Sequence, residues 1–189
     1  MKPKADLQSL GKPVKSGNRP RAVFLVGFMG AGKTSVGERL SRRLGWNFED
    51  LDDRIQSREG RLIAEIFRES GEAEFRRAEH AALRELLADL GTSPRVVALG
   101  GGAFAQSVNA TLLEEAGAPV VFLDGRADEL FLRCEQERRE RPLRHDAKQF
   151  RELYEQRRPF YLKAGWTVDT SGKDLETIAA EVACSLGLL

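Results

Sequence analysis

The chain has 189 residues, enough for one α/β domain with a substantial core and too few for two such domains. Its formal net charge is +1, which argues against a globally basic nucleic-acid-binding protein. No apolar run approaches the length of about 20 residues that a membrane-spanning helix needs. We therefore expect neither a nucleic-acid partner nor a membrane partner.

Charge is unevenly distributed, because residues 1–21 carry +5 and the remainder carries −4. The first segment contains Pro, Gly, Ser and Lys with little apolar content. We therefore predict a flexible basic tail over residues 1–21 and a single domain over residues 22–189. The tail lacks the apolar core of a secretory signal, and a transit peptide is the alternative because acids are scarce in it.

The two cysteines, Cys134 and Cys184, lie in segments with a helical pattern and lack metal-ligand spacing. We expect both to be buried free thiols, which are typical of a reducing compartment. This usage places the protein in the cytoplasm. No exposed apolar stripe stands out in the sequence, so a monomer is the default expectation.

Five short β-rich runs alternate with helical patterns along the chain. They span residues 22–26, 46–49, 96–99, 120–123 and 166–168. This alternation predicts a three-layer α/β/α fold, in which helices cover both faces of a parallel sheet.

The first predicted strand runs directly into Gly27-x-x-x-x-Gly32-Lys33-Thr34, the pattern of a phosphate-binding loop. Such a loop turns backbone N–H groups toward a phosphate, and the following helix adds its positive N-terminal end. Lys33 would reach the β- and γ-phosphates, and the Thr34 hydroxyl would complete a Mg²⁺ shell. We therefore expect a nucleoside triphosphate here, and a purely structural turn is the alternative. The nucleotide-binding residues of the loop would be Gly30, Ala31, Gly32, Lys33, Thr34 and Ser35.

Carboxylates gather in Phe48-Glu49-Asp50-Leu51-Asp52-Asp53, at the carboxyl end of the second predicted strand. In open parallel sheets, this edge is where ligands bind. Alternating side chains there could divide the work, one facing a metal ion and one facing the phosphate acceptor. The alternative is that Asp52 or Asp53 only caps the next helix.

A long helical insertion, about residues 53–90, separates the second and third predicted strands. We expect one helix over residues 53–69, interrupted near Gly60, and a second over residues 72–90. In a nucleotide-binding sheet, such an insertion is well placed to supply an acceptor site. The predicted buried stripe of the second helix is Phe75, Leu83, Leu86 and Leu87.

Arg76 and Glu79 are three residues apart and share a face of the second insertion helix. Glu79 could orient the guanidinium for a bidentate grip on an anion, or the two could form a surface ion pair. Three consecutive glycines, Gly100 to Gly102, follow the third predicted strand. Such a run is costly unless the backbone approaches something closely, so its amides could address a substrate.

The most charged stretch of the body spans about residues 135–148 and, with Arg133 just upstream, carries five arginines. We predict a mobile lid that closes over the nucleotide, and a solvated loop is the alternative. Further along, Arg157 and Arg158 precede Pro159, which fits poorly inside a helix and is expected to kink it. One of these two arginines could complete a carboxylate clamp with Arg76.

The chain resembles the shikimate kinases in six segments taken in order: G-F-M-G-A-G-K-T, F-E-D-L-D-D, G-E-A-E-F-R-R-A-E, A-L-G-G-G-A, R-P-L and R-R-P-F-Y. The resemblance covers residues 22 to about 185. Very many NTPases share the phosphate-binding loop, and the pair of motifs F-R-x-x-E and G-G-G is what points to this family among them. It implies ATP-dependent phosphorylation of the 3-hydroxyl of shikimate. It also implies a nucleoside-monophosphate-kinase-like P-loop fold with a central five-stranded parallel sheet.

The resemblance assigns roles on the nucleotide side. Lys33 would contact the transferring phosphate, Thr34 would ligate Mg²⁺, and Asp50 would hold the metal through water. Arg141 would reach the phosphates from the lid. Arg133 matches the adenine-stacking arginine of the family only if one residue is inserted, and the loop over residues 169–173 would flank the adenine.

On the acceptor side, the resemblance makes Asp52 the contact to the hydroxyls of shikimate and the candidate general base. Arg76 and Arg157 would grip the carboxylate of shikimate. Gly101 and Gly102 would line its pocket.

Two other functions stay open. A gluconate-kinase-like or nucleoside-monophosphate-kinase-like enzyme would share the loop and the lid without requiring G-G-G and F-R-x-x-E. A non-catalytic nucleotide-binding module would usually lack a catalytic side chain. Here all the expected side chains are present: Lys33, Thr34, Asp50, Asp52, Arg76 and Arg157. Arg144 departs from the family, which usually continues R-P-L-L, so lid packing could differ.

Overall fold

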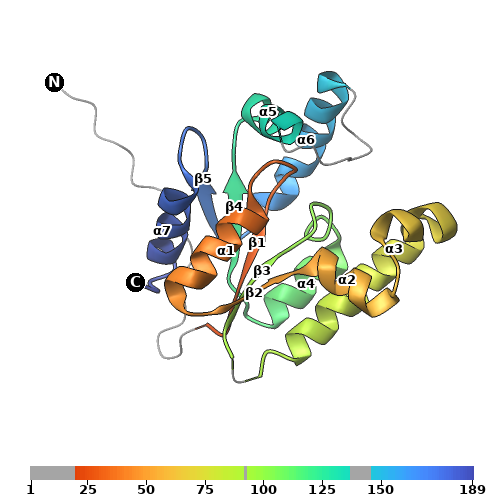
Figure 1. The fold of residues 1–189 in the computed structure, drawn as a ribbon, viewed down its shortest axis with the longest axis horizontal. Coiled ribbons are helices and arrows are strands. Elements are labelled where there is room, and N and C mark those ends of the chain that lie inside the picture. The colour runs from red at the N-terminus through yellow and green to blue at the C-terminus, as the bar shows by residue number, and fades with distance from the viewer. Residues whose placement is uncertain (1–19, 92, 137–145) are drawn as a thin grey trace.

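The computed structural model describes residues 20–91, 93–136 and 146–189, and a parallel sheet runs through its centre (Figure 1). The sheet order is β2-β3-β1-β4-β5, and all four neighbouring pairs are parallel. Each predicted strand bound lies within one residue of the observed one, and the predicted α/β/α fold is confirmed. The strands are β1 (Ala22–Val26), β2 (Asn47–Asp50), β3 (Arg95–Ala98), β4 (Val120–Asp124) and β5 (Trp166–Asp169).

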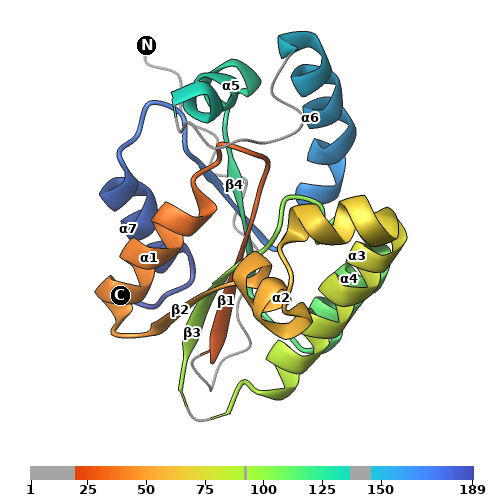
Figure 2. The same cartoon turned by 45° about the vertical axis from the view of Figure 1, so that its right-hand side comes forward.

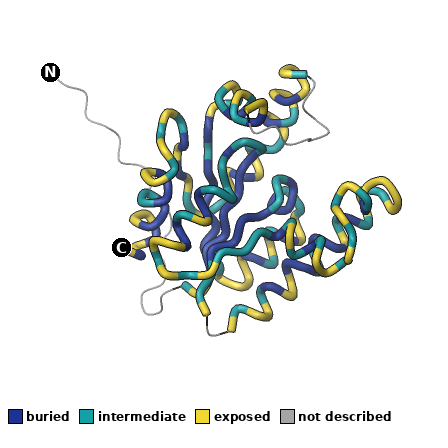
Figure 3. The backbone as a smooth tube through the Cα atoms, viewed as in Figure 1, coloured by how far each residue is buried: buried dark blue, intermediate teal, exposed yellow. Residues whose placement is uncertain are grey.

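The central strand β1 is buried along its whole length, with the sequence Ala-Val-Phe-Leu-Val. Figure 3 shows the inner strands as the buried centre of the molecule. A continuous apolar run is what a strand covered on both faces requires. Because β1 lies between β3 and β4, the loop after β1 lies in the middle of the carboxyl edge of the sheet. The loops after β3 and β4 flank it.

Helices cover the two faces of the sheet in separate groups (Figures 1 and 2). Helix α1 (Lys33–Leu44) packs with α7 (Leu175–Ser185) on one face, and α3 (Ile63–Ala88) packs with α4 (Ser107–Glu115) on the other. Helices α5 (Ala127–Gln136) and α6 (Ala147–Tyr161) pack together beyond the carboxyl edge of the sheet. Within the described residues, no helix is long and apolar enough to cross a membrane.

Helix α1 lies unusually close to β2. A Cβ atom on Gly37 would come within 2.4 Å of the Phe48 ring, so only glycine permits this approach. The contact brings the first turn of α1 next to the end of β2. The sequence thereby places Thr34 beside Asp50, although 16 residues separate them.

The predicted insertion is helical, but its first helix begins earlier and ends earlier than expected. Helix α2 (Leu51–Glu59) stops at Gly60, which adopts a left-handed conformation, and the chain then turns into α3. The interruption near Gly60 is confirmed. Residues 63–69 belong to α3, which departs from helical geometry at Gly71 (φ 78°, ψ 176°) just before the predicted second helix. Of the predicted stripe, Phe75, Leu83 and Leu86 are buried and Leu87 is half-buried.

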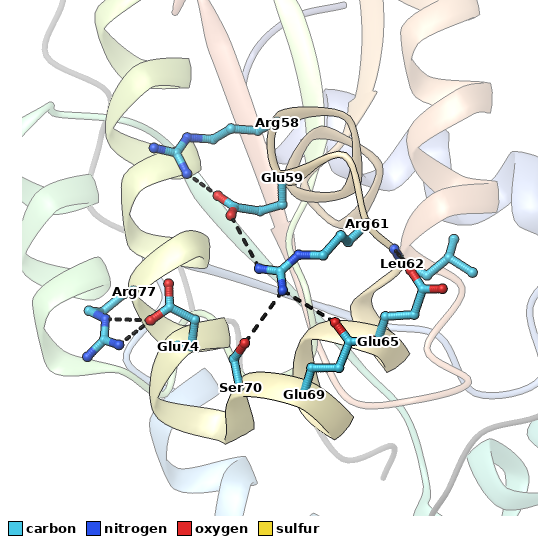
Figure 4. A network of polar contacts seen from close by, with 9 residues as sticks. All are labelled: Arg58, Glu59, Arg61, Leu62, Glu65, Glu69, Ser70, Glu74 and Arg77. Carbon is cyan, nitrogen blue, oxygen red and sulfur yellow. Dashed lines mark hydrogen bonds and ion pairs between the residues drawn. The ribbon is translucent and has the colours of Figure 1, made fainter.

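Polar contacts line the corner between α2 and α3 (Figure 4). Arg61 donates to Ser70 at 3.5 Å and pairs with Glu69 at 3.7 Å, while Glu65 accepts from the Leu62 N–H at 2.9 Å. Exposed pairs of this kind contribute little to stability.

Some expectations concern residues outside the described ranges, and others need correction. Residues 1–19 and 137–145 lie outside the described part, so the tail, most of the lid and Arg141 remain predictions. The Arg21 carbonyl accepts from the Arg95 N–H at 3.0 Å, so the domain begins before Ala22. Cys134 is buried as expected, but the prediction for Cys184 is wrong, since this residue is exposed on α7. Pro159, which was expected to fit poorly inside a helix, does not end α6, because the helix continues through it to Tyr161.

Candidate active site

The phosphate-binding loop follows β1 and leads into α1. Gly30 (φ 75°) and Gly32 (φ 79°) adopt left-handed conformations that other residues rarely take. Gly32 caps α1 without a side-chain hydrogen bond, and the first turn of α1 contains no acidic residue. The N–H groups of this turn are therefore available to an anion.

Both helices at the carboxyl edge support this loop. A Cβ atom on Gly30 would lie 2.4 Å from the Leu130 carbonyl oxygen, so the loop rests directly on α5. The Phe28 ring packs edge-on against Phe150 and Tyr154 of α6, with centroids 4.9 and 5.6 Å away. The predicted lid, residues 135–148, connects the end of α5 to the start of α6 along the chain.

The Lys33 ammonium group lies over its own loop. Nζ donates to the carbonyl oxygens of Gly27 at 3.0 Å and Phe28 at 3.2 Å. These contacts keep the positive charge beside the backbone that would surround a phosphate. A bound phosphate would lie within reach of the same flexible side chain.

Asp50 connects the phosphate-binding loop to the insertion. Its Oδ2 accepts from the Thr34 hydroxyl at 2.9 Å, and its Oδ1 accepts from the Asp52 N–H at 3.0 Å. Asp50 is thus the cap of α2, and the alternative in which Asp52 or Asp53 is the cap is wrong. The Asp52 carboxylate is therefore not used in capping. Hydroxyl and carboxylate oxygens are ligands that suit Mg²⁺.

A cavity of about 550 Å³ lies beside the phosphate-binding loop. Arg133 lines it and donates through Nη2 to the Thr170 carbonyl oxygen at 3.0 Å, so α5 meets the loop after β5 here. The structure thus brings together Arg133 and the 169–173 segment, which the sequence assigned to the adenine. Its lining also includes Gly30, Gly32, Ser35 and Lys173.

Four side chains from three segments meet at the three glycines after β3, residues 100–102, here called the glycine loop. A Cβ atom on Gly100 would lie 2.7 Å from Asp52 Oδ1 and 3.3 Å from Glu79 Oε1. On Gly102 it would lie 2.8 Å from both terminal nitrogens of Arg76, and on Gly101 3.7 Å from Arg157 Nη1. Side chains thus approach the backbone closely at Gly100 and Gly102, whereas the contact at Gly101 is of ordinary van der Waals length. That the amides of these glycines address a substrate stays a prediction. We call these four side chains the acceptor cluster: Asp52, Arg76, Glu79 and Arg157.

Arg76 and Glu79 form a buried ion pair, so the surface-pair alternative is wrong. The Glu79 side chain is 1% exposed, and its Oε2 accepts from Arg76 Nη1 at 2.9 Å. Glu72 accepts from two other nitrogens of the same guanidinium. Burial raises the pKa of Glu79, and the nearby Arg76 charge opposes this rise. Arg76 is thereby fixed on two sides, as a residue that grips an anion should be.

The structure distinguishes Arg157 from Arg158, a choice that residue spacing left open and that the family resemblance made in favour of Arg157. Arg158 Nη2 donates to Asp124 Oδ2 at 2.6 Å, at the end of β4. Arg157 Nη1 instead donates to the Gly101 carbonyl oxygen at 3.3 Å, within the acceptor cluster. Arg157 is therefore the arginine that lies near Arg76.

Sequence reasoning missed the groups that hold the glycine loop in place. The Tyr161 hydroxyl donates to the Gly101 carbonyl oxygen, and Asn109 Nδ2 donates to the Ala103 carbonyl oxygen at 3.0 Å. His80 contacts Asn109 in turn, with 2.8 Å between Nδ1 and Oδ1. The spacing of Tyr161, four residues after Arg157 on one helix, was the available signal.

A phosphate-binding loop on the central strand of a five-stranded parallel sheet, with a helical insertion beside it, defines a P-loop kinase. The family model described as shikimate kinase matches residues 29–186. This chain belongs to the shikimate kinase family.

Individual relatives agree with this membership. A shikimate kinase from Geobacter sulfurreducens is 43% identical over 166 residues, which cover 86% of this chain and 89% of the relative. The solved structure of shikimate kinase from Acinetobacter baumannii in complex with shikimate has a TM-score of 0.79 and 33% identity, and the match covers 89% of this chain and 93% of that one. A gluconokinase from Sinorhizobium meliloti, at 22% identity and a TM-score of 0.60, covers 90% of this chain and 94% of its own and shares the fold.

Proposed function

We propose that this protein transfers the γ-phosphoryl group of ATP to the 3-hydroxyl of shikimate, giving shikimate 3-phosphate and ADP for chorismate and aromatic amino acid biosynthesis. One observation carries the proposal: Arg76, Arg157 and Asp52 converge on the glycine loop at the same edge of the sheet as the phosphate-binding loop. A small acceptor with one carboxylate and several hydroxyls needs this combination of arginines and a carboxylate. The Acinetobacter baumannii relative is solved with shikimate.

On the nucleotide side, backbone N–H groups of Gly30, Ala31, Gly32 and Ser35 and the first turn of α1 surround the phosphates. Lys33 moves from its own loop carbonyls to the transferring phosphoryl group and balances its charge. The Thr34 hydroxyl and the Asp50 carboxylate, 2.9 Å apart, fit Mg²⁺, which supplies further charge neutralisation when bound. Within the described residues there is no group of three or more His, Cys, Asp or Glu that could hold a metal ion.

On the acceptor side, Arg76 and Arg157 hold the carboxylate of shikimate, and Gly101 and Gly102 line the site. Asp52 contacts the hydroxyls and serves as the candidate base. The Asp52 carboxylate lies against Gly100. The carboxylate of the buried residue Glu79 lies beside the same glycine. Holding the acceptor hydroxyl in line with the γ-phosphate supplies most of the catalysis in phosphoryl transfer.

Two arginines complete the nucleotide site in this proposal. Arg133 lies beside the adenine, together with the 169–173 segment that it contacts. Arg141 closes onto the phosphates from the lid and adds positive charge there. Its position lies outside the described residues, so its support is the family resemblance.

The proposal includes a monomer in the cytoplasm. The support for the compartment is cysteine usage, since neither Cys134 nor Cys184 forms a disulfide. The support for the monomer is that large exposed apolar side chains are scattered over several elements and form no continuous stripe in the described residues.

The test is ADP release from ATP and Mg²⁺ with shikimate, gluconate or a nucleoside monophosphate as the acceptor. We expect turnover that depends on shikimate. Turnover with gluconate or a nucleoside monophosphate in place of shikimate would overturn the acceptor assignment. Tight ATP binding without phosphorylation of any acceptor would favour the non-catalytic module.

A further inference from the structure

Tyr161 ends α6 and reaches into the acceptor cluster, although the family assignment gives it no role here. Its side chain is fully buried, and its ring packs on Phe122 with 5.3 Å between the centroids. Its hydroxyl donates to the Gly101 carbonyl oxygen, the same oxygen that Arg157 reaches at 3.3 Å. A carbonyl oxygen has two lone pairs, so both donors can be accommodated.

The hydroxyl of Tyr161 is kept as a donor by its surroundings. Burial raises the pKa of Tyr161 to about 12, against the opposing effect of the Arg157 charge. The hydroxyl is therefore protonated throughout the neutral range. A phenylalanine at this position would keep the ring packing and leave the carbonyl with Arg157 alone.

Fixing one carbonyl fixes a neighbouring N–H as well. In a trans peptide, the Gly101 carbonyl and the Gly102 N–H point in opposite directions across a rigid plane. When Tyr161 and Arg157 hold the carbonyl on one side, the Gly102 N–H must face the other side. In the described part of the chain, the Gly101 and Gly102 N–H groups donate to no acceptor.

An unused N–H beside Arg76 suits an anionic substrate group. Gly102 is buried, and its Cα lies next to the guanidinium, where a Cβ atom would come within 2.8 Å. A buried backbone donor without an acceptor is costly, so such groups usually meet a ligand or water. A carboxylate held by Arg76 would provide the acceptor.

We propose that Tyr161 is a positioning residue, which orients the Gly101–Gly102 peptide so that its N–H meets the carboxylate of the acceptor. In this inference Tyr161 touches neither the acceptor nor the nucleotide. It acts through this peptide and through the Arg157 guanidinium, which lies beside its hydroxyl at the same carbonyl oxygen. The inference rests on the proposed function, because shikimate supplies the carboxylate. The Ala103 N–H donates to the Gly100 carbonyl oxygen at 3.0 Å, and Asn109 donates to the Ala103 carbonyl oxygen at 3.0 Å. These bonds hold the ends of the loop but not the Gly101–Gly102 peptide, whose carbonyl is held by Tyr161 and Arg157.

The chain offers a matched control in Tyr154. It is also a buried tyrosine of α6, and its hydroxyl also donates to a glycine carbonyl oxygen, that of Gly125, at 3.0 Å. Gly125 follows β4 and lies outside the acceptor cluster. Tyr161→Phe and Tyr154→Phe therefore each remove a hydroxyl that donates to a glycine carbonyl oxygen, at two different loops. Tyr154→Phe also removes a hydrogen bond of 3.3 Å to Asp124 Oδ1.

The experiment measures KM for shikimate, KM for ATP, kcat and Tm for the wild type and both variants. We expect Tyr161→Phe to raise KM for shikimate by about 3- to 10-fold, as loss of one hydrogen bond allows. We expect KM for ATP to be unchanged in both variants and Tyr154→Phe to leave KM for shikimate unchanged. Equal KM for shikimate in the two variants, whatever their Tm, would overturn the inference. An inactive wild type would instead overturn the proposed function.

A second measurement uses the wild type only, in case Tyr161→Phe does not fold. In protein labelled with ¹⁵N-glycine, shikimate should shift the Gly102 amide resonance strongly. The analogue with a hydroxymethyl group in place of the carboxylate should shift it much less. A Gly102 resonance that does not respond to shikimate would overturn the inference.

Discussion

Arg76 satisfies only one of the two carboxylate oxygens of Glu79. Arg76 Nη1 donates to Glu79 Oε2 at 2.9 Å, whereas Glu79 Oε1 is buried and has no hydrogen-bond partner among the described residues. That oxygen faces Gly100, against which Asp52 also lies. A half-satisfied buried carboxylate destabilises a fold, and such features are expected at functional sites.

The raised pKa of Glu79 makes a prediction about stability and pH. The ordinary value is 4.5, and burial raises the folded-state pKa of Glu79 above it. The folded state therefore binds more protons than the unfolded state over this window, and stability falls as pH rises from 4.5 through the folded pKa. Glu79→Gln removes this titration while keeping the size of the side chain. We expect the Tm of Glu79→Gln minus that of the wild type to increase between pH 4.5 and 7.5. A decrease over the same range would show that Glu79 has a lowered pKa.

Arg76→Lys tests the anion grip, because it keeps the charge and removes the planar fork. Loss of a charge-assisted hydrogen bond of about 1.5–3 kcal/mol should weaken shikimate binding by about 10- to 100-fold. ATP binding should be retained. The control is Arg77→Lys, one residue along, whose side chain is 72% exposed and pairs with Glu74. Equal loss of shikimate and ATP binding, measured by calorimetric titration, would indicate that Arg76 is structural.

Gly102→Ala tests the close approach of the backbone to Arg76. The new methyl group would meet the guanidinium at 2.8 Å, so Arg76 must shift and its ion pair with the buried Glu79 weakens. We expect Tm to fall and kcat/KM for shikimate to fall on the order of 10- to 100-fold, as misplacement of a binding group allows. Gly165→Ala is the control, since Gly165 has no atom within 4 Å of its Cβ position. Similar activity in the two variants would contradict the arrangement.

Asp50→Asn separates the capping role of Asp50 from its role toward Mg²⁺. Asparagine caps helices about as well as aspartate, so Tm should change little. The charge that would hold Mg²⁺ is lost, so half-maximal activity should require about 10-fold more Mg²⁺. The control is Asp53→Asn, an exposed acid in the first turn of the same helix. Unchanged Mg²⁺ dependence in Asp50→Asn would remove Asp50 from the proposed metal site.

The sequence predicted the fold well because its signals are local. Apolar runs such as Ala22–Val26 identify buried strands without knowledge of the partners. Glycines at Gly30 and Gly32 identify the loop because its geometry is a property of the backbone. The prediction needed correction at the start of α2, where a non-local contact is involved. Asp50 caps the helix by accepting from the Asp52 N–H, and it also accepts a hydrogen bond from the Thr34 hydroxyl, 16 residues away.

The site was predictable in its composition and less so in its geometry. Arg157 and Arg158 are alike in residue type and spacing, and only the family resemblance favoured Arg157. In the structure their contacts separate them, because Arg158 pairs with Asp124 and Arg157 reaches the Gly101 carbonyl oxygen. Tyr161 was missed because a buried tyrosine ring in a helix usually indicates core packing. Its role depends on which carbonyl its hydroxyl reaches, and that follows from the tertiary structure.

Nuclear magnetic resonance of the reaction product tests the central claim most directly. The purified protein is incubated with ATP, Mg²⁺ and shikimate, and ³¹P and ¹H spectra are followed over time. We predict a phosphate ester whose phosphorus couples to the proton on C3 of shikimate, together with an equal amount of ADP. An ester on another hydroxyl, or no ester while gluconate is phosphorylated under the same conditions, would contradict the account.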